Sequence, residues 1–287
     1  MPMGAPSKIG LLLLAWSLQG WSQTLDADGY TLDERGFRVH RLQSEYQSAE
    51  TTVRVLLPDD LQENKLYRVL YVLPVVAAAD EKKHGDGMLE IKKRDLHNEH
   101  GLICVSPEFT AMPWYADHDS EVTRQDESHL LKVVLPFVEK NYPVLEGWNG
   151  RLLVGFSKSG WGAFTLLLRH PKLFYRAAGW DPGIRIDTGP VEEDDRNEKV
   201  ERIFGSTKNF EDYRLSTLLR RRGADLGEEA RMFYYNTKGN RALGGTKLHQ
   251  LMVKLEFPHH YVFESKRPHR WDSGWIPKAV EFLVREP

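Results

Sequence analysis

Residues 152–163 read Leu-Leu-Val-Gly-Phe-Ser-Lys-Ser-Gly-Trp-Gly-Ala. An apolar run leads directly into small residues and then into helical spacing, which is the strand, tight turn and helix of a nucleophile elbow. The serine of such an elbow lies on a strained turn, so the residues two before it and two after it must be small. Gly155 and Ser159 occupy those positions, and Ser157 is therefore the candidate nucleophile. The alternative is a structural turn whose serine caps the helix.

Short apolar runs like the one before Ser157 recur along the chain, separated by segments with helical spacing. Continuous apolar runs are typical of parallel strands buried on both faces, and the alternation indicates helices on both faces of the sheet. Two earlier segments have the pattern of antiparallel entry strands. The sequence therefore predicts an α/β fold with a mainly parallel central sheet and antiparallel N-terminal strands. The strands are expected at 37–42, 51–57, 69–73, 102–105, 152–154, 177–180, 232–235 and 260–263, and the helices at 87–97, 128–140, 162–169, 246–255 and 277–284.

The length and composition fit one domain. A chain of 287 residues with 41% hydrophobic content can bury one sizeable core, so we expect a single domain over 23–287. The charged, poorly periodic segment 191–222 predicts an insertion at about 183–230. Lys and Arg (39) nearly balance Asp and Glu (41), which argues against nucleic acid as a partner. The only cysteine, Cys104, excludes an internal disulfide and lies in an apolar run that predicts burial.

The N-terminus has the pattern of an export signal. Lys8 gives a positive start, 9–21 is apolar, and Gly20 and Ser22 are small residues suited to a signal peptidase. We expect a signal peptide at 1–22 and a secreted or periplasmic protein. Cleavage there removes one positive charge and changes the net charge from −2 to −3. The apolar stretch is short for a bilayer, so no stable membrane anchor is expected, with a retained anchor as the alternative.

A serine nucleophile needs a histidine base, which in α/β hydrolases follows the last strand. His269 comes after the β-forming run 260–263 and before the final helical segment. His259 and His260 begin that run and should emerge at the opposite edge of the sheet. His269 is therefore the candidate base, and an exposed loop histidine is the alternative.

The position of the acid is less clear. The usual site follows the strand at 232–235, but no carboxylate occurs there. Asp181 follows the preceding strand and should lie at the same edge as Ser157, where a carboxylate could fix the tautomer of the imidazole. Asp181 is therefore the candidate acid. The alternatives are a turn aspartate before proline and Asn240 as a neutral substitute.

The remaining site residues come from the loops at this edge. The backbone N–H of Lys158, at the start of the helix after the elbow, is one candidate oxyanion donor. The loop after 69–73 opens with a proline, which has no N–H, so Val75 or Val76 should supply the second donor. Trp114 and Tyr115 follow the strand at 102–105 and could form a substrate wall, although core packing explains Trp114 equally well.

Two histidines raise the question of a metal. His97 and His100 are three residues apart, a spacing compatible with metal binding, but Gly101 makes a helix C-terminus an adequate explanation. We therefore predict no metal and no cofactor.

Several of these segments together resemble the esterase branch of the α/β-hydrolase superfamily, which includes esterase D, feruloyl esterases and the antigen 85 mycolyltransferases. The resemblance extends from about residue 37 to 284 and rests on 67–74, Trp114-Tyr115, 135–138, the elbow and 269–275. It implies the α/β-hydrolase fold, with Ser157 as nucleophile, His269 as base and the Lys158 backbone as oxyanion donor.

The resemblance also implies an exported serine esterase that acts on a small-molecule or carbohydrate-linked ester through an acyl-enzyme. Two departures stand out: Pro74-Val75 replaces the usual His-Gly, and no carboxylate follows Tyr235. An acyltransferase with the same triad and a non-catalytic, esterase-like binding module are the alternatives. The sequence leaves the oligomeric state open.

Overall fold

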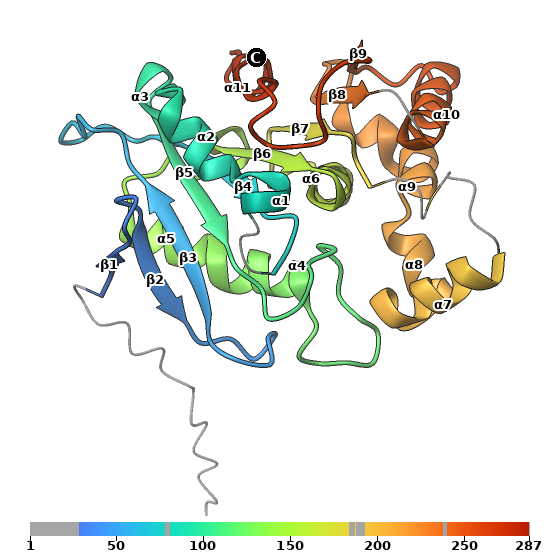
Figure 1. The fold of residues 1–287 in the computed structure, drawn as a ribbon, viewed down its shortest axis with the longest axis horizontal. Helices are drawn as coiled ribbons and strands as arrows, with labels where there is room; N and C mark the ends of the chain where they lie inside the picture. Colours follow the sequence, from blue (N-terminus) through green and yellow to red (C-terminus); the bar gives the residue numbers. More distant parts are fainter. Residues whose placement is uncertain (1–28, 78–80, 184–186, 188–192, 238–239, 287) are drawn as a thin grey trace, which may run out of the picture.

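The computed structural model describes residues 29–77, 81–183, 187, 193–237 and 240–286 (Figure 1). Nine strands form one sheet in the order β1-β2-β3-β5-β4-β6-β7-β8-β9. The strands from β4 to β9 pair in parallel, whereas β1, β2, β3 and β5 pair antiparallel in succession. This confirms the predicted arrangement. The strands are β1 (Thr31–Leu32), β2 (Arg38–Leu42), β3 (Thr51–Leu56), β4 (Arg68–Leu73), β5 (Leu102–Pro107), β6 (Arg151–Phe156), β7 (Arg176–Trp180), β8 (Met232–Thr237) and β9 (His260–Glu264).

Helices cover both faces of the sheet (Figure 1). The predicted helix at 87–97 is two helices, because the backbone between them takes a left-handed conformation at Asp95, with φ of 60°. The predicted helix at 128–140 extends over 126–141 and contains a π-helical turn before Pro136, which has no N–H to continue the α-helical pattern. The helices are α1 (Glu81–His84), α2 (Gly87–Lys93), α3 (Leu96–Glu99), α4 (Asp126–His129), η1 (Leu130–Val134), α5 (Leu135–Asn141), η2 (Trp148–Gly150), α6 (Lys158–Arg169), α7 (Glu193–Phe204), α8 (Thr207–Tyr213), α9 (Leu215–Arg222), η4 (Gly223–Leu226), α10 (Asn240–Lys254) and α11 (Ile276–Leu283).

The sheet separates two apolar clusters, one on each face. Along β4, Val69 and Tyr71 belong to one cluster, whereas Leu70 and Val72 belong to the other. Because both faces are covered, successive residues are all buried, which is the physical reason for the continuous apolar runs. Cys104 is fully buried in one of these clusters, as predicted, and burial raises the pKa of its thiol.

The charged segment after β7 contains three helices, α7, α8 and α9, which lie together beside the sheet (Figure 1). Apolar side chains such as Phe204, Phe210 and Leu218 pack into one of the two clusters. The prediction of a poorly periodic insertion therefore missed its helical content. Short helices joined by tight turns give little periodicity in the sequence.

A buried carboxylate connects this helical segment to the sheet-covering helices. Glu127 of α4 accepts hydrogen bonds from Nε and Nη2 of Arg169 at 3.0 and 2.9 Å, from the Tyr213 hydroxyl at 2.8 Å, and contacts His170. Burial alone would raise the pKa of Glu127, but the hydrogen bonds with His170 and Arg169 outweigh it and lower this pKa to about 2. The ionised carboxylate thus joins α4, α6 and α8.

The predicted signal peptide lies outside the described residues. Within the part of the chain that the structure describes, no helix is both long and apolar enough to cross a bilayer.

Candidate active site

The turn at Ser157 has the strained geometry of a nucleophile elbow. Ser157 follows the last residue of β6 and precedes the first residue of α6, with φ of 56° and ψ of −121°. A Cβ atom added at Gly155 would lie 2.1 Å from the Ser159 carbonyl oxygen, so only glycine fits there. The N–H of Ser157 donates to the Trp180 carbonyl at 2.8 Å, and the N–H of Gly183 donates to the Ser157 carbonyl at 2.7 Å. These bonds hold the strained residue against the end of β7.

Ser159 stands where glycine is usual, and its hydroxyl is accommodated. The residue is fully buried, and its Oγ accepts the N–H of Phe156 and donates to the Phe156 carbonyl, both at 2.9 Å. A buried hydroxyl costs little when both of its hydrogen-bonding roles are satisfied. The substitution is therefore compatible with the elbow and adds two bonds within it.

The structure brings Asp181 and His269 together at the same edge of the sheet. Oδ2 of Asp181 lies 2.9 Å from Nδ1 of His269. The Asp181 side chain is completely buried, and that of His269 is 14% exposed. Asp181 directly follows β7 with a φ of 40°, and its N–H donates to the Tyr235 carbonyl at 2.8 Å. This geometry matches that of an acid and base pair in a hydrolase triad.

Thr237, the last residue of β8, completes the environment of the carboxylate. Its N–H donates to Oδ1 of Asp181 at 2.7 Å and its hydroxyl donates to Oδ2 at 2.5 Å. The strand that usually carries the acid therefore supplies hydrogen-bond donors to an acid carried by the neighbouring strand. The side chain of Asn240, the alternative to Asp181, lies outside what the structure describes.

Aromatic rings and backbone contacts fix the position of His269. Its ring lies 4.3 Å from that of Phe156 and 6.4 Å, edge to face, from that of His84, measured between centroids. The N–H of Trp271 donates to the His84 carbonyl at 2.8 Å, which joins the histidine loop to α1. His260 begins β9 at the other edge of the sheet, as predicted.

The two valines expected to donate to the oxyanion lie in the loop after β4. Val75 and Val76 line a small pocket together with His84 and Trp271. This places the loop beside the histidine segment at the edge of the sheet where Ser157 lies. Their donor role, like that of the Lys158 backbone, remains a prediction.

Trp114 and Tyr115, the two residues predicted to form a substrate wall, are both buried. Tyr115 is fully buried, and a Cβ atom added at Gly162 would lie 2.1 Å from its ring, so it packs tightly against α6. Its hydroxyl donates to the Pro74 carbonyl at 2.5 Å, and this bond ties Tyr115 to the loop after β4. Trp114 is 7% exposed and packs edge to face on Trp161. The prediction that Tyr115 faces a substrate is wrong because its ring fills the core.

The side chain of Lys158, the residue after Ser157, is partly exposed. Its Nζ contacts the Met112 sulfur at 2.5 Å. Partial burial lowers the pKa of Lys158, and the nearby charges of Lys199 and Lys83 lower it further. The sequence predicted a role for the Lys158 backbone only. It did not predict that Thr237 would contact Asp181 or that His84 would lie beside His269. A threonine ending a strand carries no signal of its own until the strand order places it beside a carboxylate.

Comparisons with known proteins bear on the family and the fold of this chain. Residues 44–185 match the esterase family described as "Putative esterase", a segment that includes Ser157 and Asp181 but not His269. Esterase Rv1288 of Mycobacterium tuberculosis (strain ATCC 25618 / H37Rv) is 31% identical over 144 residues, which are 48% of this chain and 31% of that protein. The match thus spans about a third of the curated relative.

Two solved structures show the same fold. An S-formylglutathione hydrolase from Agrobacterium tumefaciens superimposes with a TM-score of 0.70 at 16% identity, covering 86% of this chain and 94% of that one. The ferulic acid esterase AmCE1/Fae1A from Anaeromyces mucronatus, solved with ferulic acid, gives 0.58 at 18% identity, covering 86% and 89%. The chain therefore has the α/β-hydrolase fold, and its resemblance to the esterase branch of that superfamily, predicted from the sequence, is confirmed.

Proposed function

We propose that this protein is a serine esterase that hydrolyses a carboxylic ester through an acyl-enzyme on Ser157. The observation that carries the proposal is the 2.9 Å contact between Asp181 and His269 at the sheet edge where Ser157 occupies its strained turn. Ser157, Asp181 and His269 come from three separate segments, in the chain order of nucleophile, acid and base that α/β hydrolases use for acyl transfer. The family match over 44–185 supports the same reaction class.

In this mechanism His269 accepts the proton of the Ser157 hydroxyl as the oxygen attacks the ester carbonyl. Asp181 holds Nδ1 of the imidazole, so that Nε2 remains free to act as the base. The tetrahedral oxyanion accepts hydrogen bonds from the backbone N–H groups of Lys158 and of Val75 or Val76. Collapse expels the alcohol, which takes the proton from His269, and water then releases the acid by the same steps in reverse.

The proposed substrate is a small-molecule or carbohydrate-linked ester. Support comes from AmCE1/Fae1A, whose solved structure contains ferulic acid. Esters of this kind are the first candidates for a substrate screen.

A fluorophosphonate probe tests the nucleophile directly. The wild-type protein should become covalently labelled at Ser157, located by mass spectrometry of the labelled peptide. A folded protein that resists labelling and hydrolyses no ester would instead support a non-catalytic, esterase-like binding module. Adding an alcohol acceptor to the hydrolysis assay separates the esterase from an acyltransferase, because the latter yields a new ester in preference to the acid.

We further propose that the protein is exported after cleavage behind Ser22. The pattern at 1–22 and the absence of any cysteine pair in the sequence are both compatible with export. Expression of the full chain in a bacterial host, followed by N-terminal sequencing of the extracytoplasmic fraction, should give a protein that begins at Gln23. Recovery of an uncleaved, membrane-bound chain would contradict this.

A further inference from the structure

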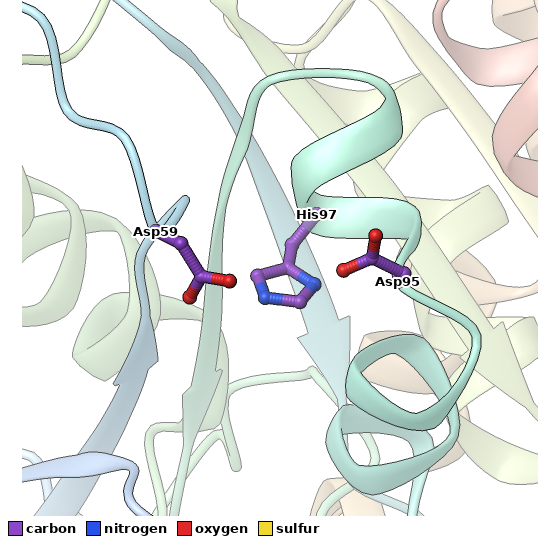
Figure 2. Close-up of side chains that lie close together, drawn as sticks. All are labelled: Asp59, Asp95 and His97. Carbon is purple, nitrogen blue, oxygen red and sulfur yellow. The ribbon is translucent and has the colours of Figure 1, made fainter.

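A cluster of three potential metal ligands lies away from the active site. Asp59, in the loop after β3, and Asp95 and His97, at the start of α3, each offer an atom within 4.8 Å of the others. Figure 2 shows the imidazole of His97 lying between the two carboxylates. The cluster is at the amino-terminal end of β5, whereas Ser157 follows the carboxyl end of the parallel strand β6. It is therefore independent of the proposed esterase site.

His97 is the observation that distinguishes this cluster from a chance grouping of surface acids. The residue is only 3% exposed, and its buried Nδ1 has no hydrogen-bond partner in the described part of the chain. A buried ring nitrogen without a partner costs free energy, whereas binding a cation would satisfy it.

Asn98 holds the two carboxylates in place. Its side-chain N–H groups donate to Asp59 at 2.8 Å and to Asp95 at 2.6 Å, and its carbonyl accepts the N–H of Asp59 at 2.8 Å. Partners of this kind orient metal ligands in known sites. They also explain why the like charges of Asp59 and Asp95 remain close together.

We propose that Asp59, Asp95 and His97 bind a zinc ion that joins the loop after β3 to α3. One imidazole nitrogen and two carboxylate oxygens form a mixed donor set that suits Zn²⁺, whereas Ca²⁺ and Mg²⁺ prefer oxygen donors alone. For a tetrahedral ion with bonds of about 2.0–2.2 Å, the ligand atoms, which lie within 4.8 Å of one another, must approach to roughly 3.4 Å. Water completes the coordination, since both carboxylates are at the surface. The sequence pointed to His97 with His100, and no metal was predicted from that pair. Asp59 could not be added to it from the sequence, because only the fold brings Asp59 to His97.

Calorimetric titration of the chelator-treated full chain with ZnCl₂ tests the proposal. Wild type should bind one ion at this site, and its melting temperature should rise by a few degrees at saturation. The changes Asp59→Asn and His97→Gln should each weaken binding at least about 100-fold, because loss of even the outer partners of metal ligands costs about 10- to 100-fold. Asp59 is exposed, so its variant should fold even if the His97 variant does not.

Two histidine variants serve as matched controls. His100→Gln changes a neighbouring histidine outside the cluster, and His259→Gln removes one partner of the His249–His259 hydrogen bond of 2.9 Å, which also lies outside it. Both controls should bind Zn²⁺ and gain stability as wild type does. Equal binding by all four variants, or loss of binding only in a control, would overturn the assignment. Ester hydrolysis should be unaffected by the chelator, so this outcome is separate from that of the proposed function.

Discussion

Replacing Asp181 with asparagine should lower the turnover of ester hydrolysis by about 10⁴-fold, as it does in the trypsin-type triad that serves as the precedent. The environment of Asp181 shows why. The Thr237 N–H donates to Oδ1, so the asparagine must keep its carbonyl oxygen at that position. Its amide nitrogen then replaces Oδ2 and points N–H groups at Nδ1 of His269. The imidazole must accept there, which places its proton on Nε2 and removes the base that Ser157 needs.

The expected loss corresponds to about 5.4 kcal/mol of transition-state stabilisation, at about 1.36 kcal/mol for each tenfold change. A matched control is Thr237→Val, which removes the hydroxyl donor to Oδ2 but keeps the backbone N–H and the tautomer. One hydrogen bond to a charged group is worth about 1.5 kcal/mol, so this variant should lose only about tenfold.

Both variants should be assayed for kcat with a p-nitrophenyl ester, alongside circular dichroism to establish that they are folded. An Asp181→Asn protein within about tenfold of wild type would refute the role of Asp181 as triad acid. Equal losses in the two variants would instead mean that the local structure, rather than the histidine tautomer, had been damaged.

Substitutions at Ser157, His269 and Glu127 test the nucleophile, the base and the buried carboxylate. Ser157→Ala should reduce ester turnover by about 10⁴-fold or more while the melting temperature stays near that of wild type, and a folded variant with normal turnover would remove the central proposal. His269→Ala should be similarly inactive, whereas His260→Ala, at the opposite end of β9, should keep most activity; the reverse result would contradict the assignment of the base. Glu127→Gln should lower the free energy of unfolding by about 3 kcal/mol at pH 7, because it leaves the partly buried Arg169 without its charged partner. Since folding lowers the pKa of Glu127 to about 2, this difference should be complete above about pH 4.5 and shrink as the pH falls toward 2, and denaturant unfolding at pH 7 and 3 that gave equal differences would refute it.

Much of the active site could be predicted from the sequence because its signals are local. A buried strand, small residues around Ser157 and a helix are encoded within twelve consecutive residues, and chain order alone then places a histidine after the last strand. The parallel sheet was predictable for a similar reason: burial on both faces leaves continuous apolar runs that few other structures produce. Asp181 could be proposed because the carboxyl ends of neighbouring parallel strands meet at one edge.

The tertiary structure decided everything that depends on partners far apart in the chain. The sequence could place Asp181 near His269, but only the pairing of β7 with β8 brings Thr237 to the carboxylate and so fixes which oxygen faces the imidazole. The sequence predicted Tyr115 in a substrate wall, but its ring packs against Gly162 and is fully buried in the core. Asp59 is likewise 38 residues from His97. The pairing of β3 with β5 brings them together, because Asp59 follows β3 and His97 precedes β5. Such contacts leave no periodicity, because their energy comes from the packed fold and not from neighbours in the sequence.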